Sequence, residues 1–479
     1  MLETPRRWVR SIPASAKGGR HNGLPLSLPG SSTTLEGPTP EEGDVADDRQ
    51  LDRTKFLGVA AAGAATVGGL GFTGYARAKG RPETAAAIQA AKPFLIGCPF
   101  PLHSFYAADG NQMKNGSGLA IDEINSSGGI AGRKIDRIVI DADVATPEGV
   151  TTAFKKLVSA KVDAILVGYI QVDAPSYDIA AAYGAPYIHG NTLDAGVQRV
   201  KANPAKYFNI FNVDSTEVHY GINFPLYLAR LASSGQFKPR AKTIHFIEGD
   251  LGYSQNISRA GQTAFKKAGW NVVGVEKVVT PTNDWTPVIG KLHSKNAAVV
   301  MNCHPAPADL AQFMKQFAAN PTNALVYLQY GPSVPQFLQL AGKSANGAIW
   351  STVIGTFNDQ VGKAFQAKYR AKYKSDPGFA NAGQCYDEVY MLAEAWGRVG
   401  NPRNFKAVAR VLRTTIHRGV SGTINMNRPG QYSLSYPFET DDPSLGMAHL
   451  YFQIQNGKQT IIFPSPYAEA RYKKAPWQK

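Results

Sequence analysis

The chain has 479 residues, of which 43% are hydrophobic and 18% are charged, so it can bury more than one core and global disorder is excluded. Its 3 cysteines are too few for a disulfide framework or a four-cysteine zinc site, and no other ligand spacing predicts a metal or a cofactor. Lys and Arg outnumber Asp and Glu by 51 to 36, but these charges are spread along the chain. Because no nucleic-acid-binding motif accompanies them, we expect no nucleic-acid partner.

Residues 1–50 are rich in Pro, Gly, Ser and Arg and show no hydrophobic period, which predicts a disordered segment that need not belong to the native product. Residues 51–78 combine a basic start, an apolar run at 58–72 and a small-residue site at Ala76-Arg77-Ala78. This pattern is typical of a secretory signal, with a retained membrane anchor as the alternative. We therefore expect an exported protein, periplasmic or associated with the cell envelope, whose translation starts near Val45 or Leu51.

From residue 92 onward, short apolar runs alternate with stretches of helical spacing. The first set predicts strands at 93–98, 134–140, 164–167 and 186–189, and helices at 113–124, 146–160 and 174–183. A second set predicts strands at 243–248, 271–278, 297–302 and 324–328, and helices at 254–268, 286–295 and 308–318. Such alternation is typical of parallel sheets flanked by helices. The sequence therefore predicts an α/β protein with two Rossmann-like lobes and a cleft between them.

Open parallel sheets bind ligands beyond the carboxyl ends of their strands. Aromatic and amide side chains dominate the residues that follow the predicted strands, and no pair of carboxylates or G-x-S-x-G motif occurs there. Cys303 and His304 are adjacent, but neighbours on an extended segment point to opposite faces and are poorly placed to act together. We therefore expect a binding protein and not an enzyme.

Several of these segments follow one family's pattern in order. The chain reads Ala120-Ile121-Asp122-Glu123-Ile124-Asn125 and then Gly128-Gly129-Ile130-Ala131-Gly132, and further matching segments lie at 162–168, 184–188, 249–254, 282–285, 386–387 and 419–424. The set resembles periplasmic solute-binding proteins of ABC importers, of the branched-chain amino acid and amide-urea type. The resemblance spans roughly residues 92–455.

The resemblance implies a clamshell of two lobes joined by a three-crossing hinge. Lobe 1 would comprise residues 92–213 plus 354–435, and lobe 2 residues 214–353 plus 436–479. The protein would be a monomer that traps a small-molecule solute by closure and delivers it to an ABC permease in the membrane. The alternative is a sensor, in which the same clamshell signals its occupancy to a membrane partner.

The resemblance also indicates which residues of lobe 1 hold the solute. The expected ligand-binding residues are Tyr106, Tyr169, Gln171, Gly190, Asn191 and Thr192. Hydroxyl and amide groups at these positions can donate hydrogen bonds to a solute carboxylate or carbonyl. For Asn191 and Thr192 the alternative is that they cap a helix.

Lobe 2 is expected to contribute Tyr253, His304 and Tyr330. In proteins of this kind an acidic residue of lobe 2 pairs with the solute ammonium, and that position falls near Gln329 and Tyr330. A buried ammonium without a counter-charge costs several kcal/mol. The missing acid therefore favours an amide, a urea-like compound or a carboxylate over a branched-chain amino acid.

Overall fold

The computed structural model describes residues 92–103 and 106–479. The chain divides into two units, Met1–Ala65 and Thr66–Lys479, and all described residues belong to the second. The segment 1–50 that we predict to be disordered and the signal at 51–78 thus lie outside the described residues. Within the described ranges, no helix combines the length and the apolar character needed to cross a membrane.

The first sheet has five parallel strands in the order β2-β1-β3-β4-β5. The strands are β1 (Phe94–Phe100), β2 (Ile135–Asp141), β3 (Ala164–Val167), β4 (Tyr187–His189) and β5 (Ile210–Asn212). The helices between them are α3 (Ala107–Ser126), α4 (Pro147–Ser159), α5 (Ala174–Tyr183) and α6 (Asp194–Ala202). Strand β3 is buried along its whole length, as its unbroken apolar run Ala-Ile-Leu-Val predicts for a central parallel strand.

Local sequence signals set the ends of these helices. The side chain of Thr146 accepts a hydrogen bond from the Gly149 amide, and Pro147 follows at the first helical position of α4. Helix α5 ends at Gly184, which has a left-handed φ of 86° that glycine adopts without strain. Both ends agree closely with the boundaries expected from the sequence.

The second sheet has seven strands in the order β16-β15-β10-β9-β8-β6-β7. The strands are β6 (Thr243–Gly249), β7 (Asn271–Val278), β8 (Val299–Asn302), β9 (Leu325–Gln329), β10 (Ile349–Thr352), β15 (Leu450–Gln455) and β16 (Lys458–Phe463). The helices around it are α7 (Val218–Ser233), α8 (Gly252–Lys267), α9 (Thr286–Lys295), α10 (Pro307–Ala319) and α11 (Pro335–Ala341). The five strands β6–β10 pair in parallel, whereas β15 and β16 add an antiparallel edge.

The sequence analysis did not predict the antiparallel edge. Strands β15 and β16 are joined at Asn456 and Gly457, whose φ angles of 53° and 73° are both positive, as a two-residue hairpin of the Asn-Gly kind requires. The signal for this hairpin was therefore present in the sequence.

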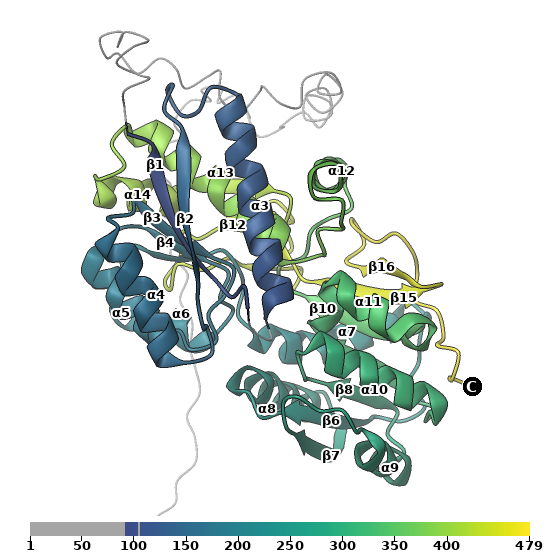
Figure 1. Ribbon diagram of the computed structural model, residues 1–479. Helices are drawn as coiled ribbons and strands as arrows, with labels where there is room; N and C mark the ends of the chain where they lie inside the picture. The colour runs from purple at the N-terminus through teal and green to yellow at the C-terminus, as the bar shows by residue number, and fades with distance from the viewer. Residues whose placement is uncertain (1–91, 104–105) are drawn as a thin grey trace, which may run out of the picture. The chain divides into compact units, whose positions relative to one another are not determined.

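The chain passes between the two sheets three times. After β5 it enters the second sheet, and after β10 it returns as α12 (Gln360–Tyr373), α13 (Asn381–Val399) and α14 (Phe405–Thr414) before β15 joins the second sheet again. Helix α13 packs along α3, and α4 lies beside α5 (Figure 1). The α/β fold with two parallel-stranded, helix-flanked lobes is confirmed. The lobe limits 92–213 plus 354–435 and 214–353 plus 436–479 stay a proposal.

Apolar side chains fill both faces of the second sheet. Val299 and Met301 of β8 belong to one buried cluster, and Val300 between them belongs to another. The first cluster continues through α7 and α8 into the first sheet, whereas the second packs against α9, α10 and α11. This alternation along a strand is why the sheet needs helices on both sides.

Candidate functional site

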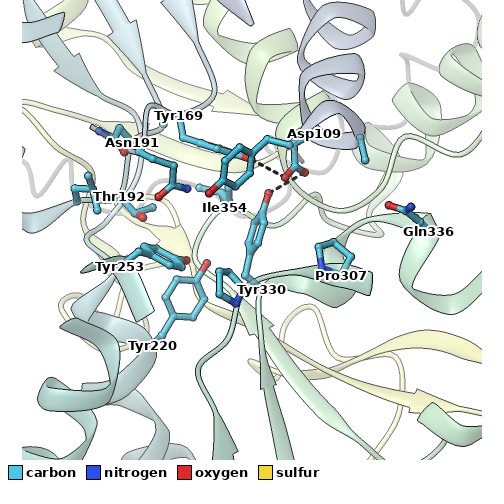
Figure 2. A pocket seen from close by; sticks show the side chains of 16 residues that line it. Asp109, Tyr169, Asn191, Thr192, Tyr220, Tyr253, Pro307, Tyr330, Gln336 and Ile354 are labelled. Carbon is cyan, nitrogen blue, oxygen red and sulfur yellow. Dashed lines mark hydrogen bonds between the residues drawn. The ribbon is translucent and has the colours of Figure 1, made fainter. Parts of the chain in front are cut away.

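A pocket of about 60 Å³ lies where the carboxyl ends of strands from both sheets meet (Figure 2). Its walls are Tyr106, Ala108, Asp109, Tyr169, Gln171, Gly190, Asn191, Thr192, Leu193, Tyr220, Tyr253, Pro305, Pro307, Tyr330, Gln336 and Ile354. Residues after β3 and β4 form one side, and residues from α7, α8 and the loops after β8 and β9 form the other.

The structure brings eight of the nine expected site residues together in this pocket. They are Tyr106, Tyr169, Gln171, Gly190, Asn191, Thr192, Tyr253 and Tyr330. His304, the ninth, is not among the lining residues. Their role in solute binding stays a prediction, but their convergence from separate segments follows from the shared edge at which parallel strands end.

His304 is not a lining residue of the pocket, and its ring packs against Trp285 of the second lobe. Its side chain is fully buried, its Nδ1 accepts a hydrogen bond from the Ala306 amide at 3.1 Å, and its Nε2 lies 3.2 Å from the Asp309 carboxylate. Asp309 in turn accepts a hydrogen bond from the Thr282 amide at 2.7 Å. The ring therefore links the loop after β8 to the start of α10, and the expectation that it reaches the cleft needs correction.

Replacing Asp309 by alanine should lower the free energy of unfolding by about 2 kcal/mol, because the buried Thr282 amide would lose its acceptor. His304 Nε2 would lose the nearby carboxylate and keep only Thr280 Oγ1, 3.2 Å away. Urea denaturation followed by circular dichroism measures the loss. Asp136→Ala is the control, because Asp136 is exposed and should change stability by less than about 0.5 kcal/mol. Equal effects of the two substitutions would contradict this account of His304.

Cys303 does not provide a reactive thiolate beside His304. Its side chain is fully buried, and this burial raises the pKa of the thiol well above its usual value. Cys98 and Cys385 are also free and buried. The structure therefore gives no support to thiolate catalysis at this position.

Asn191 and Thr192 do not cap a helix. Helix α6 begins at Asp194, and its N-cap residue is Leu193. Asn191 is 2% exposed, and its Nδ2 has no hydrogen-bond partner, so this donor remains available at the pocket wall. His189, just before them, is a buried strand-end histidine whose desolvation lowers its pKa to about 3, and its Nδ1 accepts from the Asn191 amide at 3.0 Å.

Tyrosine rings form the second-lobe wall of the pocket. Tyr253, at the start of α8, accepts a hydrogen bond from Gln329 Nε2 at 2.6 Å, and Tyr220 of α7 accepts one from the Val353 amide at 3.2 Å. Their ring centroids lie 6.4 Å apart in an edge-to-face arrangement. Gln329, which stands where the resemblance led us to look for an acid, thus holds Tyr253 in place.

Asp109 is a pocket residue that the sequence analysis missed. It is 5% exposed, and it accepts hydrogen bonds from Tyr169 at 2.8 Å, Tyr330 at 3.2 Å and Asn381 at 2.8 Å (Figure 2). Burial raises the pKa of its carboxyl to about 6 in spite of these three bonds, each of which lowers it. The pocket therefore holds an acid, although not at the position where the resemblance placed one.

The reason for the miss is the start of α3. The sequence predicts a helix from residue 113, because Gly110 and Asn111 are weak helix formers, but the helix begins at Ala107. A Cβ on Gly110 would lie 2.0 Å from the Pro101 carbonyl oxygen, so glycine here permits close packing and does not end the helix. An Asp in the first turn of a helix was the available signal.

The buried acids make stability depend on pH. Burial raises the pKa of Asp109 and Asp173 to about 6 and that of Glu217 to about 7, above their ordinary values of 3.8 and 4.5. Their stabilising effect is complete below about pH 4 and is lost as pH rises through 6 to 7, because the unfolded chain ionises first. Buried His189, whose pKa is lowered to about 3, acts in the opposite direction between pH 5 and 7.5. We therefore expect the contribution of Asp109 to stability, taken by itself, to be smaller at pH 7.5 than at pH 5.

Urea denaturation at the two pH values checks this prediction. Asp109→Asn should shift the unfolding free energy at pH 7.5, relative to that at pH 5, upward by about 1 kcal/mol, because a raised pKa contributes about 1.4 kcal/mol for each pH unit between 5 and 6. Asp136→Asn serves as the control, since Asp136 is exposed. If Asp109→Asn left the pH dependence as it is in the unchanged protein, Asp109 would not be the titrating group.

Two α/β lobes, with a pocket walled mainly by tyrosine rings where their strand ends meet, are the features of a protein that holds a small solute. Residues 93–432 match the family of periplasmic binding proteins, and the chain belongs to that family. The match covers most of the described residues, including the first sheet and the five parallel strands of the second, but not β15 and β16. Proteins of this family bind the solutes of transporters and are not enzymes, in agreement with the sequence analysis.

The names of several relatives refer to branched-chain amino acids. The Leu/Ile/Val-binding protein homolog 3 of Brucella melitensis is 25% identical over 326 residues, which are 66% of this chain and 82% of the relative. A solved protein from Silicibacter pomeroyi, whose name associates it with a branched-chain amino acid ABC transporter, is 36% identical with a TM-score of 0.76 and covers 81% of this chain and 100% of its own.

A more distant solved structure supports the fold alone. The substrate-binding protein of a branched-chain amino acid transporter from Streptococcus pneumoniae, solved with isoleucine, is 21% identical with a TM-score of 0.65 and covers 78% of this chain and 100% of its own.

Proposed function

We propose that this chain is an extracytoplasmic solute-binding protein that captures a small solute between its two lobes and delivers it to the permease of an ABC transporter. The observation that carries the proposal is the pocket at the strand ends, to which both sheets contribute side chains. A solute that contacts both walls favours the closed arrangement, because only that arrangement gives it all its contacts. The names of the relatives support a transport role.

The solute that we propose is an amide, a urea-like compound, a carboxylate or a branched-chain amino acid. Proteins with this fold have been solved with isoleucine and, in Rhodopseudomonas palustris, with benzoate, so the fold alone does not select among these classes. The pocket walls are tyrosine rings with a few amide, hydroxyl and carboxyl groups. Such walls suit a compact solute with one or two polar ends.

A thermal-shift panel of these four solute classes tests the proposal. A solute at about 100 times its dissociation constant should stabilise the protein by about 2.7 kcal/mol and raise its melting temperature by a few degrees. Isothermal titration should then show saturable binding at one site, and the solute should be recovered unchanged. Chemical conversion of the solute would contradict a binding role.

Uptake and location complete the test. Cells that lack this chain should lose uptake of the solute that binds, and fractionation should find the chain outside the cytoplasm. N-terminal sequencing distinguishes a cleaved signal at 51–78 from a retained anchor, and peptides from residues 1–40 would contradict a start near Val45 or Leu51. Size-exclusion chromatography tests the expected monomer.

A further inference from the structure

The described pocket walls carry a negatively charged group but no positively charged one. Asp109 is the acidic residue among the lining side chains that the structure describes, and none of those side chains is Lys, Arg or His. The carboxyl group is buried rather than solvated at the rim, since only 5% of the residue is exposed. A buried carboxylate without a cation nearby favours a ligand that donates hydrogen bonds or carries positive charge.

Asp109 also fixes the direction in which two tyrosine hydroxyls donate their hydrogens. Tyr169 donates its hydroxyl hydrogen to Asp109 Oδ2, and Tyr330 donates its own to Oδ1. A hydroxyl has one hydrogen, so each of these oxygens can offer only lone pairs to a solute. Asn381 holds the arrangement, because its Nδ2 donates to Asp109 Oδ1 at 2.8 Å and to the Tyr330 hydroxyl at 2.7 Å. This end of the pocket therefore accepts hydrogen bonds.

The opposite side of the pocket offers donors. Figure 2 shows Asn191 and Thr192 across the pocket from Asp109. The Nδ2 of Asn191 is buried and has no partner, which is costly unless a solute or a water accepts from it. Thr192 is 8% exposed and adds a hydroxyl that can donate to the same group.

We propose that Asp109 determines the solute class: the solute carries an N–H donor group, an ammonium or a primary amide, that faces Asp109, and an oxygen acceptor that faces Asn191 and Thr192. This inference rests on the proposed function and specifies it. The acid comes from α3 in the first sheet's half of the pocket and not from the end of β9, where Gln329 and Tyr330 stand. The argument that a missing acid disfavours an amino acid therefore no longer applies.

Matched solutes test the inference on the unaltered protein at pH 7.5. L-alanine, propanamide and propionate form one set, and L-leucine, 4-methylpentanamide and 4-methylpentanoate form a larger set with the same polar ends. Isothermal titration should detect binding of the amino acid or the amide in at least one set. The affinity for that solute should be at least tenfold higher than for the carboxylate of the same set, which lacks nitrogen. The more tightly bound of the two identifies which N–H donor the site prefers.

Asp109→Asn adds the residue-level test. It should weaken binding of an amino acid by about 100-fold and of an amide by about tenfold, because the loss is larger for a charged donor. The control is Asp173→Asn, since Asp173 is a buried acid with a similarly raised pKa that does not line the pocket, and it should leave the relative affinities unchanged.

The outcomes separate this inference from the proposed function. Binding of propionate or 4-methylpentanoate as tightly as the nitrogen-bearing solutes would overturn the role of Asp109 and leave a solute-binding protein. A folded Asp109→Asn variant with unchanged relative affinities would do the same. Absence of binding by all six compounds and by every solute of the thermal-shift panel would overturn both, whereas binding of a panel carboxylate without nitrogen alone would overturn only the role of Asp109. If Asp109→Asn does not fold, the matched solutes still decide the question.

Discussion

Replacing Trp285 by alanine is expected to lower the free energy of unfolding by about 4 kcal/mol and to leave the solute affinity of the folded protein unchanged. The indole is fully buried and packs edge-on against the rings of Phe313 and His304, with centroids 5.2 and 5.9 Å away. Truncation would leave a large cavity beneath α9 and α10, which cannot close without moving both helices. Urea denaturation measures the stability change, and calorimetry measures the affinity.

The unchanged affinity distinguishes a packing anchor from a ligand contact. Trp285 is absent from the pocket walls, although it belongs to the segment 282–285 that resembles the family pattern. Trp477→Ala provides the control, because Trp477 is only half-buried and should cost less stability. A Trp285→Ala variant that kept its stability but bound solute at least tenfold more weakly would place the indole in the site and refute our interpretation.

Gly190→Ala is expected to lower the free energy of unfolding by about 3 kcal/mol and to weaken solute binding at least tenfold. A Cβ at this position would lie 1.6 Å from Gln384 Nε2. Gln384 is fully buried, and that same nitrogen donates to the Gly168 carbonyl at 3.3 Å and to Glu388 Oε1 at 2.9 Å. The amide would have to break these bonds, or the loop that carries Asn191 would have to move away from the pocket.

Two further variants make this prediction specific. Gly252→Ala is the control, because a Cβ there meets no atom within 4 Å, even though Gly252 precedes the pocket residue Tyr253. Combining Gly190→Ala with Gln384→Ala should recover part of the lost stability, since the second change removes the clashing amide. No recovery in the double variant, measured by urea denaturation, would show that the clash with Gln384 is not the cause.

The sequence predicted most elements because their signals are local. The runs at 164–167, 174–183, 271–278 and 286–295 coincide with β3, α5, β7 and α9. The early start of α3 was missed, because weak helix formers there are compensated by packing against Pro101, which no local pattern reveals. The alternation of strands with helices does not reveal strands β15 and β16, which pair with each other as a hairpin, although Asn456-Gly457 marks their turn.

The candidate site, like the fold, could be predicted from the sequence only in part. Eight expected residues line the pocket because they follow strands, and the carboxyl ends of parallel strands share an edge. The direction of His304 depends on Asp309 and on the turn at Thr282, so its place after β8 did not determine it. The acid in the pocket comes from a helix start that the strand-end rule does not cover.

By itself, the sequence determined the α/β architecture, the family resemblance and the aromatic and amide character of the pocket, because these depend on residue type and on spacing along short segments. Only the tertiary structure decided which side chains meet. Asp109 contacts Tyr330 across 221 positions and Asn381 across 272, and these contacts set the polarity of the pocket. The physical reason is that side-chain direction and burial depend on packing between segments that are distant in the chain, which no local pattern contains.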